Sequence, residues 1–436
     1  RQPGPRLRSH TPVSPRPPRG SERSAREIRA STHGAHRVEG SGASGGKVLS
    51  SRLAYQVVLK EIQPATYLLE SAPAGVDVAL QARASAGRLG FVTPRDLQLP
   101  ERPAMIPTQI TGEPGRRWPV MMGAVLLLVV LLGPRASLTE RWIEPDLGGD
   151  VEGYLALNEA TVPGLRPGDE KSIVWANPDT YERTPISVVY LHGFSADRHE
   201  VDPLPKLVAE ALGANIYYAR LAGHGRDGSA MGEATAEAWL DDAAEAMAVG
   251  RAIGDRVVLV GTSTGGTLAM WTASRPEARD EVAALVVLSP NFGPRAAAAQ
   301  VLLWPWGGLI ARAVVGPERC FEPANEVQAR HWTTCYPTRV LLPMMALVER
   351  ARTLDFSEVT APLLMMYSDE DLVVDSDVTV ATFGHFGSVP KTLLSVDASP
   401  GAAFHVLAGD ILSPETTDTV ADVVITFLAQ ALGGVG

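Results

Sequence analysis

The chain has 436 residues, of which 45% are hydrophobic and 20% are charged, and its formal net charge at pH 7 is −10. The part from about residue 137 onward is long enough for one α/β domain with an insertion. Its acidic balance argues against nucleic acid as a partner, because phosphates select basic surfaces. With two cysteines, no Cys-x-x-Cys and no His/Cys cluster, the sequence predicts no metal site. No glycine-rich nucleotide loop is visible, so we predict no cofactor.

The first 104 residues differ in composition from the rest. They carry 16 Lys and Arg against 8 Asp and Glu, and they show no sustained hydrophobic periodicity. Such a segment is predicted to be disordered. The first methionine is Met105, so we interpret residues 1–104 as a non-native segment translated upstream of the true start. A basic tail that binds nucleic acid or membrane is the alternative.

Residues 105–136 contain an apolar run, Val120–Gly133, which follows Arg116 and Arg117. The run is shorter than the roughly 20 residues that span a bilayer, and its length suits the hydrophobic region of an export signal. Residues 134–136 lack the small-x-small cleavage pattern, so an uncleaved membrane anchor is one alternative and a buried core helix is another. We therefore expect an exported protein, periplasmic or extracellular, or a membrane-anchored one, rather than a cytoplasmic protein.

Apolar and amphipathic stretches alternate through the rest of the chain. Strands are expected at about 172–175, 186–191, 214–219, 256–260, 283–289, 363–368 and 391–396, and helices at about 202–213, 233–252, 264–277 and 416–432. This alternation predicts an α/β protein with a mostly parallel sheet and helices on both faces.

The strand expected at 186–191 ends in the turn His192-Gly193-Phe194-Ser195. Two backbone N–H groups aimed at a developing oxyanion supply much of the rate enhancement in acyl transfer. The natural donors are the amide of Phe194, in this turn, and the amide of Thr264, in a second turn described next. His192 is expected to pack under the loop, and His224 is expected to be a hydrogen-bonded loop histidine.

The second turn is Gly261-Thr262-Ser263-Thr264-Gly265, which joins the apolar strand 256–260 to a predicted helix. A serine must be exposed on a constrained turn, beside a base, to act as a nucleophile. Gly42-Ala43-Ser44-Gly45-Gly46 has the same pattern, but no apolar strand precedes it. Ser263 is therefore the candidate nucleophile, and an idle serine in a glycine-rich turn is the alternative.

About seventy residues separate the strand ending near Ser289 from the one beginning at Leu363, too many for a single crossover helix. We therefore divide the chain after residue 136 into a core (137–289), a cap (290–360) and a second part of the core (361–436). The apolar runs of the cap either face an apolar substrate or pack against each other. Both cysteines, Cys320 and Cys335, fall in the cap; they would pair in an exported protein and stay thiols in a reducing cytosol.

In hydrolases with a serine on such a strand-turn-helix, the catalytic acid and then the catalytic histidine follow the serine along the chain. Asp371 follows the strand 363–368, and a histidine that reaches the serine belongs after the last strand, where His405 lies. His385 precedes that strand and is expected at the surface. Four other acidic residues of this loop are alternatives to Asp371, namely Asp369, Glu370, Asp375 and Asp377. Asp369 is the second choice among them.

Together these residues resemble the α/β-hydrolase superfamily, in particular its carboxylesterase and monoacylglycerol-lipase-like serine hydrolases. The resemblance covers roughly residues 150 to 436 and rests on His192-Gly193-Phe194, Gly223-His224-Gly225, Gly261-Thr262-Ser263-Thr264-Gly265, Asp371 and His405. It implies an α/β-hydrolase fold with an inserted helical cap, a triad of Ser263, Asp371 and His405, and oxyanion amides at Phe194 and Thr264. Thr262 replaces the His or bulky residue usual at its position, which bears on the substrate range.

We therefore expect a serine carboxylic-ester hydrolase that acts through an acyl-enzyme on small esters with an apolar acyl group. Hydrolysis of amides or thioesters, and acyl transfer, use the same machinery and remain alternatives. An alternative from another class is a non-catalytic binding module with this fold.

Overall fold

The computed structural model describes residues 117–397 and 399–433. The predicted upstream segment, 1–104, and the start of segment 105–136 lie outside the described residues. The first described helix, α2 (Arg117–Leu131), is exposed along its described side chains, which contradicts the alternative of a buried core helix. In the described part of the chain, no helix combines the length and the apolar character that a membrane crossing requires. The export signal or anchor stays a prediction.

A seven-stranded sheet forms the centre of the fold, in the order β1-β3-β2-β4-β5-β8-β9. Its strands are β1 (Ser172–Val174), β2 (Thr184–Leu191), β3 (Asn215–Tyr218), β4 (Gly254–Thr262), β5 (Val282–Leu288), β8 (Leu363–Tyr367) and β9 (Lys391–Ser395). β1 pairs antiparallel with β3, and the other pairs are parallel. The mostly parallel sheet confirms the prediction. The carboxyl ends of β2, β4, β5, β8 and β9 share one edge, where an open α/β sheet places its ligand.

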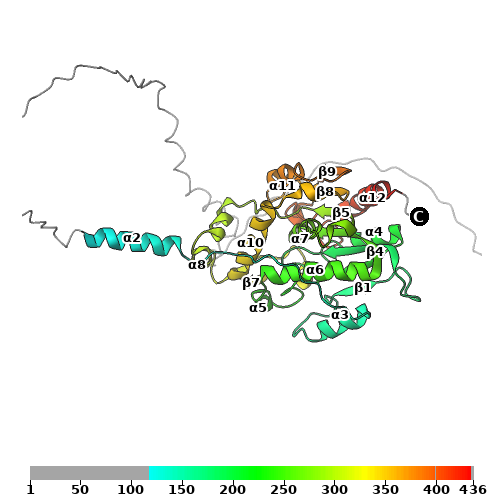
Figure 1. Ribbon diagram of the computed structural model, residues 1–436, viewed down its shortest axis with the longest axis horizontal. Helices are drawn as coiled ribbons and strands as arrows, with labels where there is room; N and C mark the ends of the chain where they lie inside the picture. The colour runs from blue at the N-terminus through cyan, green and yellow to red at the C-terminus, as the bar shows by residue number, and fades with distance from the viewer. Residues whose placement is uncertain (1–116, 398, 434–436) are drawn as a thin grey trace, which may run out of the picture. The chain divides into compact units, whose positions relative to one another are not determined.

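The central strands are apolar along their length because helices cover both faces of the sheet. One apolar core lies under α6, α7 and α10 and includes Trp239, Trp271 and Met345. The other lies under α4 and α12 and includes Val208 and Leu428. Figure 1 shows these helices around the strands, which are α4 (Leu204–Leu212), α6 (Ala236–Ile253), α7 (Thr264–Ala273), α10 (Leu341–Arg352) and α12 (Pro414–Ala431).

The predicted helices form, with small differences at their ends. α7 stops at Ala273 rather than near residue 277, because Pro276 disfavours helical geometry in the residue before it and cannot donate a helical hydrogen bond. α4 ends at Gly213, whose φ of +58° makes a left-handed cap. Three further helices outside the cap are α3 (Val151–Ala160), α5 (Gly228–Met231) and α11 (Ser376–Phe383).

The segment between β5 and β8 is mostly helical, as predicted, but it also holds a small antiparallel sheet. Its elements include α8 (Gly307–Val315), β6 (Glu318–Cys320), α9 (Glu326–His331), β7 (Cys335–Pro337) and α10. Cys320 and Cys335 face each other across β6 and β7 and form a disulfide bond. The apolar run that contains α10 packs into the core. This supports the alternative that the apolar residues of the cap pack within the protein rather than face a substrate. Trp304 in the other apolar run is 57% exposed.

Candidate active site

Ser263 lies at the sharp turn between β4 and α7. Its backbone has φ +52° and ψ −117°, a conformation that residues other than glycine rarely adopt and that is typical of a nucleophile elbow. A hydrogen bond from Ser263 N to Leu288 O, 2.9 Å long, holds the turn against the end of β5. The serine is thereby fixed at the carboxyl edge of the sheet.

Two glycines make this turn sterically possible. A Cβ on Gly265 would lie 2.0 Å from Leu191 O, and a Cβ on Gly261 would lie 2.5 Å from Gly265 O. Both clashing atoms belong to the backbone, so no side chain can rotate away to relieve them. The glycines two residues before and after the serine are therefore required by the close approach of β2, β4 and α7.

We expect Gly265→Ala to lower the free energy of unfolding by about 2–3 kcal/mol, because the added methyl group displaces the turn. Urea unfolding of the variant and the parent protein measures this loss. Gly293→Ala is the matched control, since its Cβ meets only Arg352 atoms at 3.9 and 4.0 Å. Equal stability of Gly265→Ala and the parent protein would show that the turn is less crowded than the structure indicates.

The structure brings His405 and Asp371 together. His405 Nδ1 lies 2.7 Å from Asp371 Oδ2, and both side chains are buried. Asp371 Oδ1 accepts hydrogen bonds from the amides of Val373 (2.7 Å) and Val374 (2.9 Å). These bonds fix the carboxylate, so that it can hold the imidazole in one tautomer and one orientation.

The rival acids are engaged elsewhere. Asp369 Oδ2 accepts a hydrogen bond of 2.6 Å from Ser395 Oγ at the surface. Asp375 caps the N-terminus of α11, and Glu370 and Asp377 are exposed. His385 is also exposed, as expected from its position before β9. Of the candidate acids, Asp371 is the one that contacts His405.

Ser263 follows β4, Asp371 follows β8, and His405 lies on the loop after β9, so all three lie beyond the same edge of the sheet. Within the described residues, no hydrogen bond joins the Ser263 hydroxyl to His405. Catalytic hydrogen bonds are often long in the absence of substrate and tighten in the complex. Ala403 and Phe404, directly before His405, both have positive φ values, of 52° and 57°, which mark this loop as conformationally strained.

The turn after β2 lies against the N-terminus of α7. A Cβ on Gly265 would also come within 2.5 Å of His192 O, so the residues around Phe194 and Thr264 are neighbours. In the described part of the chain, neither the Phe194 amide nor the Thr264 amide donates a hydrogen bond. Both amides are therefore free to donate to a ligand beside Ser263.

His192 and His224 support this turn from below, as expected. His192 Nε2 accepts a hydrogen bond from the Leu221 amide (3.1 Å), and His224 Nε2 accepts one from the Ser195 amide (3.0 Å). Burial lowers the pKa of His192 to about 4 and that of His224 to about 3. Both imidazoles are neutral at physiological pH, which the acceptor role of Nε2 requires.

Glu200 is a residue of this region that the sequence analysis missed. Its Oε2 accepts hydrogen bonds from the Gly193 amide (2.7 Å) and the Tyr190 hydroxyl (3.2 Å), and the side chain is buried. Burial raises the pKa of Glu200 to about 7, against the opposing effects of the Gly193 bond and of His405. From sequence alone, a glutamate in a polar loop indicates a solvated side chain, so only the fold shows that Glu200 holds the Phe194 turn.

We expect Glu200→Gln to flatten the pH dependence of stability. A carboxyl group whose pKa is raised on folding stabilises the protein below pH 4.5, and that contribution is lost as the pH rises to about 7. This loss in the free energy of unfolding is about 3 kcal/mol. Glutamine does not ionise, so the variant does not show the loss. Urea unfolding at pH 5 and pH 8 measures the difference between the variant and the parent protein.

Glu200→Ala serves as the contrast, because it leaves the Gly193 amide without its acceptor. This variant should lose about 10- to 100-fold in kcat through a misplaced Phe194 turn, whereas Glu200→Gln should keep most of the activity. A parallel pH dependence in Glu200→Gln and the parent protein would contradict the raised pKa.

Buried polar atoms without a partner gather next to Ser263. Among the described residues, Thr264 Oγ1, Ser289 Oγ and Asn291 Oδ1 lack a hydrogen-bond partner. The amide of Asn291 donates to Ser263 O (3.1 Å), so this residue is directly joined to the serine. Buried polar groups are nearly always hydrogen-bonded. The three exceptions lie on Thr264, which follows the serine, and on the segment 289–291 after β5, which contacts it.

The mostly parallel sheet and the strained serine turn at its carboxyl edge define an α/β-hydrolase. The model of the family described as "Serine aminopeptidase, S33" matches residues 184–405, and the chain belongs to this family. The chain is also similar to a thermostable monoacylglycerol lipase from Bacillus sp. (strain H-257). The two are 25% identical over 239 residues, which cover 55% of this chain and 90% of that lipase.

Solved structures similar to the chain include one reported for LipS and LipT, two metagenome-derived lipolytic enzymes. It is 21% identical, with a TM-score of 0.49, and covers 61% of this chain and 99% of its own. The monoacylglycerol lipase of Paleococcus ferrophilus is 16% identical, with a TM-score of 0.44, and covers 60% of this chain and 98% of its own. The family match and the curated lipase confirm the predicted resemblance to esterase- and lipase-like α/β-hydrolases.

Proposed function

We propose that the protein is a serine carboxylic-ester hydrolase that acts through an acyl-enzyme. The observation that carries this proposal is the buried contact of 2.7 Å between His405 Nδ1 and Asp371 Oδ2, beyond the same sheet edge as the strained Ser263 turn. A non-catalytic binding module has no need for a buried acid–imidazole pair beside a serine held at φ +52°.

In the first half of the reaction, Ser263 Oγ attacks the ester carbonyl carbon while His405 Nε2 accepts the hydroxyl proton. Asp371 keeps the Nδ1–H tautomer and stabilises the imidazolium that forms. The amides of Phe194 and Thr264 donate to the oxyanion of the tetrahedral intermediate. When this intermediate collapses, the C–O bond to the alcohol breaks and His405 returns the proton to the leaving oxygen.

In the second half, a water molecule attacks the acyl-enzyme and His405 accepts a proton from that water. The same amides stabilise the second oxyanion. Collapse of the second intermediate releases the carboxylic acid, and the proton returns to Ser263 Oγ. The cycle consumes one ester and one water and requires no group beyond the residues named.

We further propose a small ester with an apolar acyl group as substrate. Aromatic rings surround the oxyanion turn: the ring centroid of Phe194 lies 5.3 Å from that of Tyr336 in the cap and 6.1 Å from that of Trp239. In addition, Met344 of α10 contacts Asn291, with 3.5 Å between Nδ2 and Sδ. The oxyanion turn thus packs against an apolar part of the core, and the similar Bacillus protein is a monoacylglycerol lipase.

Hydrolysis of p-nitrophenyl esters from acetate to palmitate by the full chain tests the proposed function. We expect turnover of these esters, with the chain-length profile showing how large an acyl group the cap admits. A parallel assay with aminoacyl p-nitroanilides tests amide hydrolysis on the same machinery. Turnover of anilides without turnover of any ester would replace the ester proposal with an aminopeptidase, and no turnover of either would contradict both.

A further inference from the structure

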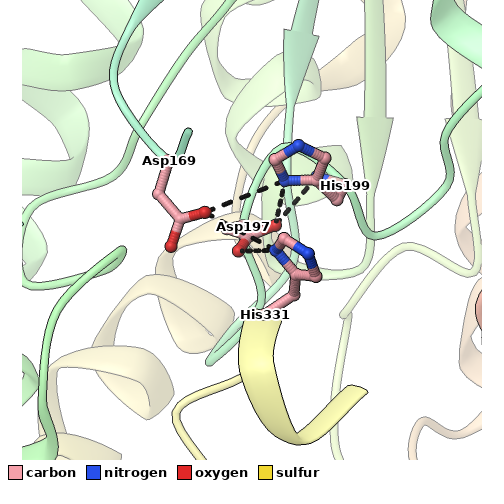
Figure 2. Close-up of side chains that lie close together, drawn as sticks. All are labelled: Asp169, Asp197, His199 and His331. Carbon is pink, nitrogen blue, oxygen red and sulfur yellow. Dashed lines mark hydrogen bonds and ion pairs between the residues drawn. The ribbon is translucent and has the colours of Figure 1, made fainter. Parts of the chain in front are cut away.

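Four side chains outside the candidate active site converge on one point. Asp169 comes from the turn before β1, Asp197 and His199 come from the loop after β2, and His331 ends α9 of the cap. Figure 2 shows both imidazoles with a ring nitrogen toward the two carboxylates. One nitrogen or oxygen atom from each residue lies within 4.8 Å of all the others. The proposed ester hydrolysis uses none of these side chains.

Asp197 forms a hydrogen bond with each imidazole, and Asp169 lies slightly farther from both. His199 Nδ1 lies 3.1 Å from Asp197 Oδ1, and His331 Nδ1 lies 3.0 Å from Asp197 Oδ2. Asp169 Oδ1 lies 3.8 Å from His199 Nδ1 and 3.6 Å from His331 Nδ1, too far for hydrogen bonds. Four ligands at about 2.0–2.1 Å from a tetrahedral zinc ion lie about 3.3–3.4 Å apart. The four separations, which involve both oxygens of Asp197, lie between 3.0 and 3.8 Å, so small side-chain shifts would allow all four residues to reach one ion.

Burial and charge favour a cation at this point. Asp169 is 2% exposed and Asp197 is fully buried, so two carboxylates face each other away from water. Arg166 supplies one positive charge, with Nε 2.7 Å from Asp169 Oδ2 and Nη2 3.9 Å from Asp197 Oδ2, and leaves Asp169 Oδ1 toward the two imidazoles. Such an outer partner, which orients a ligating oxygen, is typical of metal sites.

We propose that Asp169, Asp197, His199 and His331 bind one zinc ion. Two imidazoles with two carboxylates suit zinc, whereas calcium and magnesium prefer oxygen ligands alone. Four protein ligands close the coordination shell, which makes the ion structural rather than catalytic. A surface pocket of about 460 Å³, with His199 and His331 among its lining residues, provides an entry path.

The ion would join three segments that are distant from one another in the sequence. Asp197 and His199 lie on the loop that begins with the Phe194 turn, and His331 belongs to the cap. Nearby, the Thr333 amide donates a hydrogen bond of 2.7 Å to Ser195 O. Zinc at this point would therefore fasten the cap to the oxyanion loop. This consequence for activity depends on the proposed ester hydrolysis, but the binding of the ion does not.

The direct test is zinc binding by the full, untagged chain after treatment with EDTA and dialysis. We expect calorimetric titration with zinc chloride, and elemental analysis of the dialysed complex, to give one ion per chain. Zinc in 100-fold excess over Kd should raise Tm by about 5 °C. Cobalt(II) should bind the same group and give the intense visible absorption of a tetrahedral centre. Magnesium should not raise Tm.

Variants separate this site from other histidines. His331→Gln should weaken zinc binding by about 100-fold or more, because it removes a ligand, and Asp197→Asn should do the same. His385→Gln, at an exposed histidine outside the group, should retain one ion and the rise in Tm. Since Asp197 is buried, circular dichroism must first show that Asp197→Asn is folded; His331→Gln carries the test if it is not.

The inactive Ser263→Ala chain should bind zinc as tightly as the parent protein, so that failure of the ester-hydrolase proposal leaves this result unaffected. No zinc retained by the parent protein and no rise in its Tm would overturn the proposal. An unchanged stoichiometry in His331→Gln would equally overturn it, and would place the ion elsewhere. In either case the four side chains would form a hydrogen-bonded ion-pair network without metal.

Discussion

Replacing Ser263 with alanine is expected to lower kcat for p-nitrophenyl ester hydrolysis by about 10⁴- to 10⁶-fold, because the hydroxyl that forms the acyl-enzyme is lost. KM should change little, since the oxyanion turn and its apolar surroundings remain. The fold should also remain, because alanine has no more steric bulk than serine at this positive φ. Steady-state kinetics and a thermal unfolding curve measure these effects.

The chain supplies a matched control for this variant. Ser44 sits in a second Gly-x-Ser-x-Gly sequence, Gly42 to Gly46, which no apolar strand precedes. Ser44→Ala should leave kcat and KM unchanged. Residual activity in Ser263→Ala within tenfold of the parent protein, or a loss in Ser44→Ala, would show that the nucleophile lies elsewhere.

Replacing Asp371 with asparagine is expected to lower kcat by about 10³- to 10⁴-fold. The amide that takes the place of the carboxylate can donate to His405 Nδ1, which favours the tautomer with its proton on Nε2. That tautomer cannot accept the proton of Ser263, and the imidazolium loses its counter-charge. Steady-state kinetics of the variant and the parent protein measure this loss, and circular dichroism checks that the variant is folded.

Asp369→Asn is the control for the acid, since Asp369 was the reserve candidate and accepts a hydrogen bond from Ser395 at the surface. We expect less than a threefold change in kcat for this variant, as is usual for surface substitutions. A large loss in Asp369→Asn together with a small one in Asp371→Asn would exchange the two assignments.

The sheet and its main helices could be predicted from local patterns. Strands such as Val257–Val260 are continuous apolar runs because both faces are covered, and α6 has apolar residues at three- and four-residue steps. The position of Ser263 was predictable because the two glycines of its turn meet neighbouring backbone atoms. His405 could be singled out because it follows the last strand of the sheet. In each case the residues that indicate the structure lie within about ten positions of one another in the sequence.

Features made by distant segments could not be predicted. The Asp197–His331 contact joins residues 134 positions apart, and no spacing in the sequence shows that a cap helix returns to the loop after β2. Our prediction of no metal site considered only ligands close in sequence, so the group around Asp197 was missed. Glu200 escaped notice for the same reason, because its burial depends on how the Phe194 turn packs. The small sheet that carries the disulfide is also a tertiary feature.

Labelling with diethyl p-nitrophenyl phosphate, followed by intact mass and peptide mapping, tests the central claim most directly. This compound phosphorylates an activated serine and releases p-nitrophenol. We predict one diethylphosphoryl group per chain, located on Ser263, with loss of esterase activity in proportion to labelling. His405→Ala should slow the labelling, and Ser263→Ala should abolish it. An active protein that takes up no label, or that carries the label on another residue, would contradict the proposed mechanism.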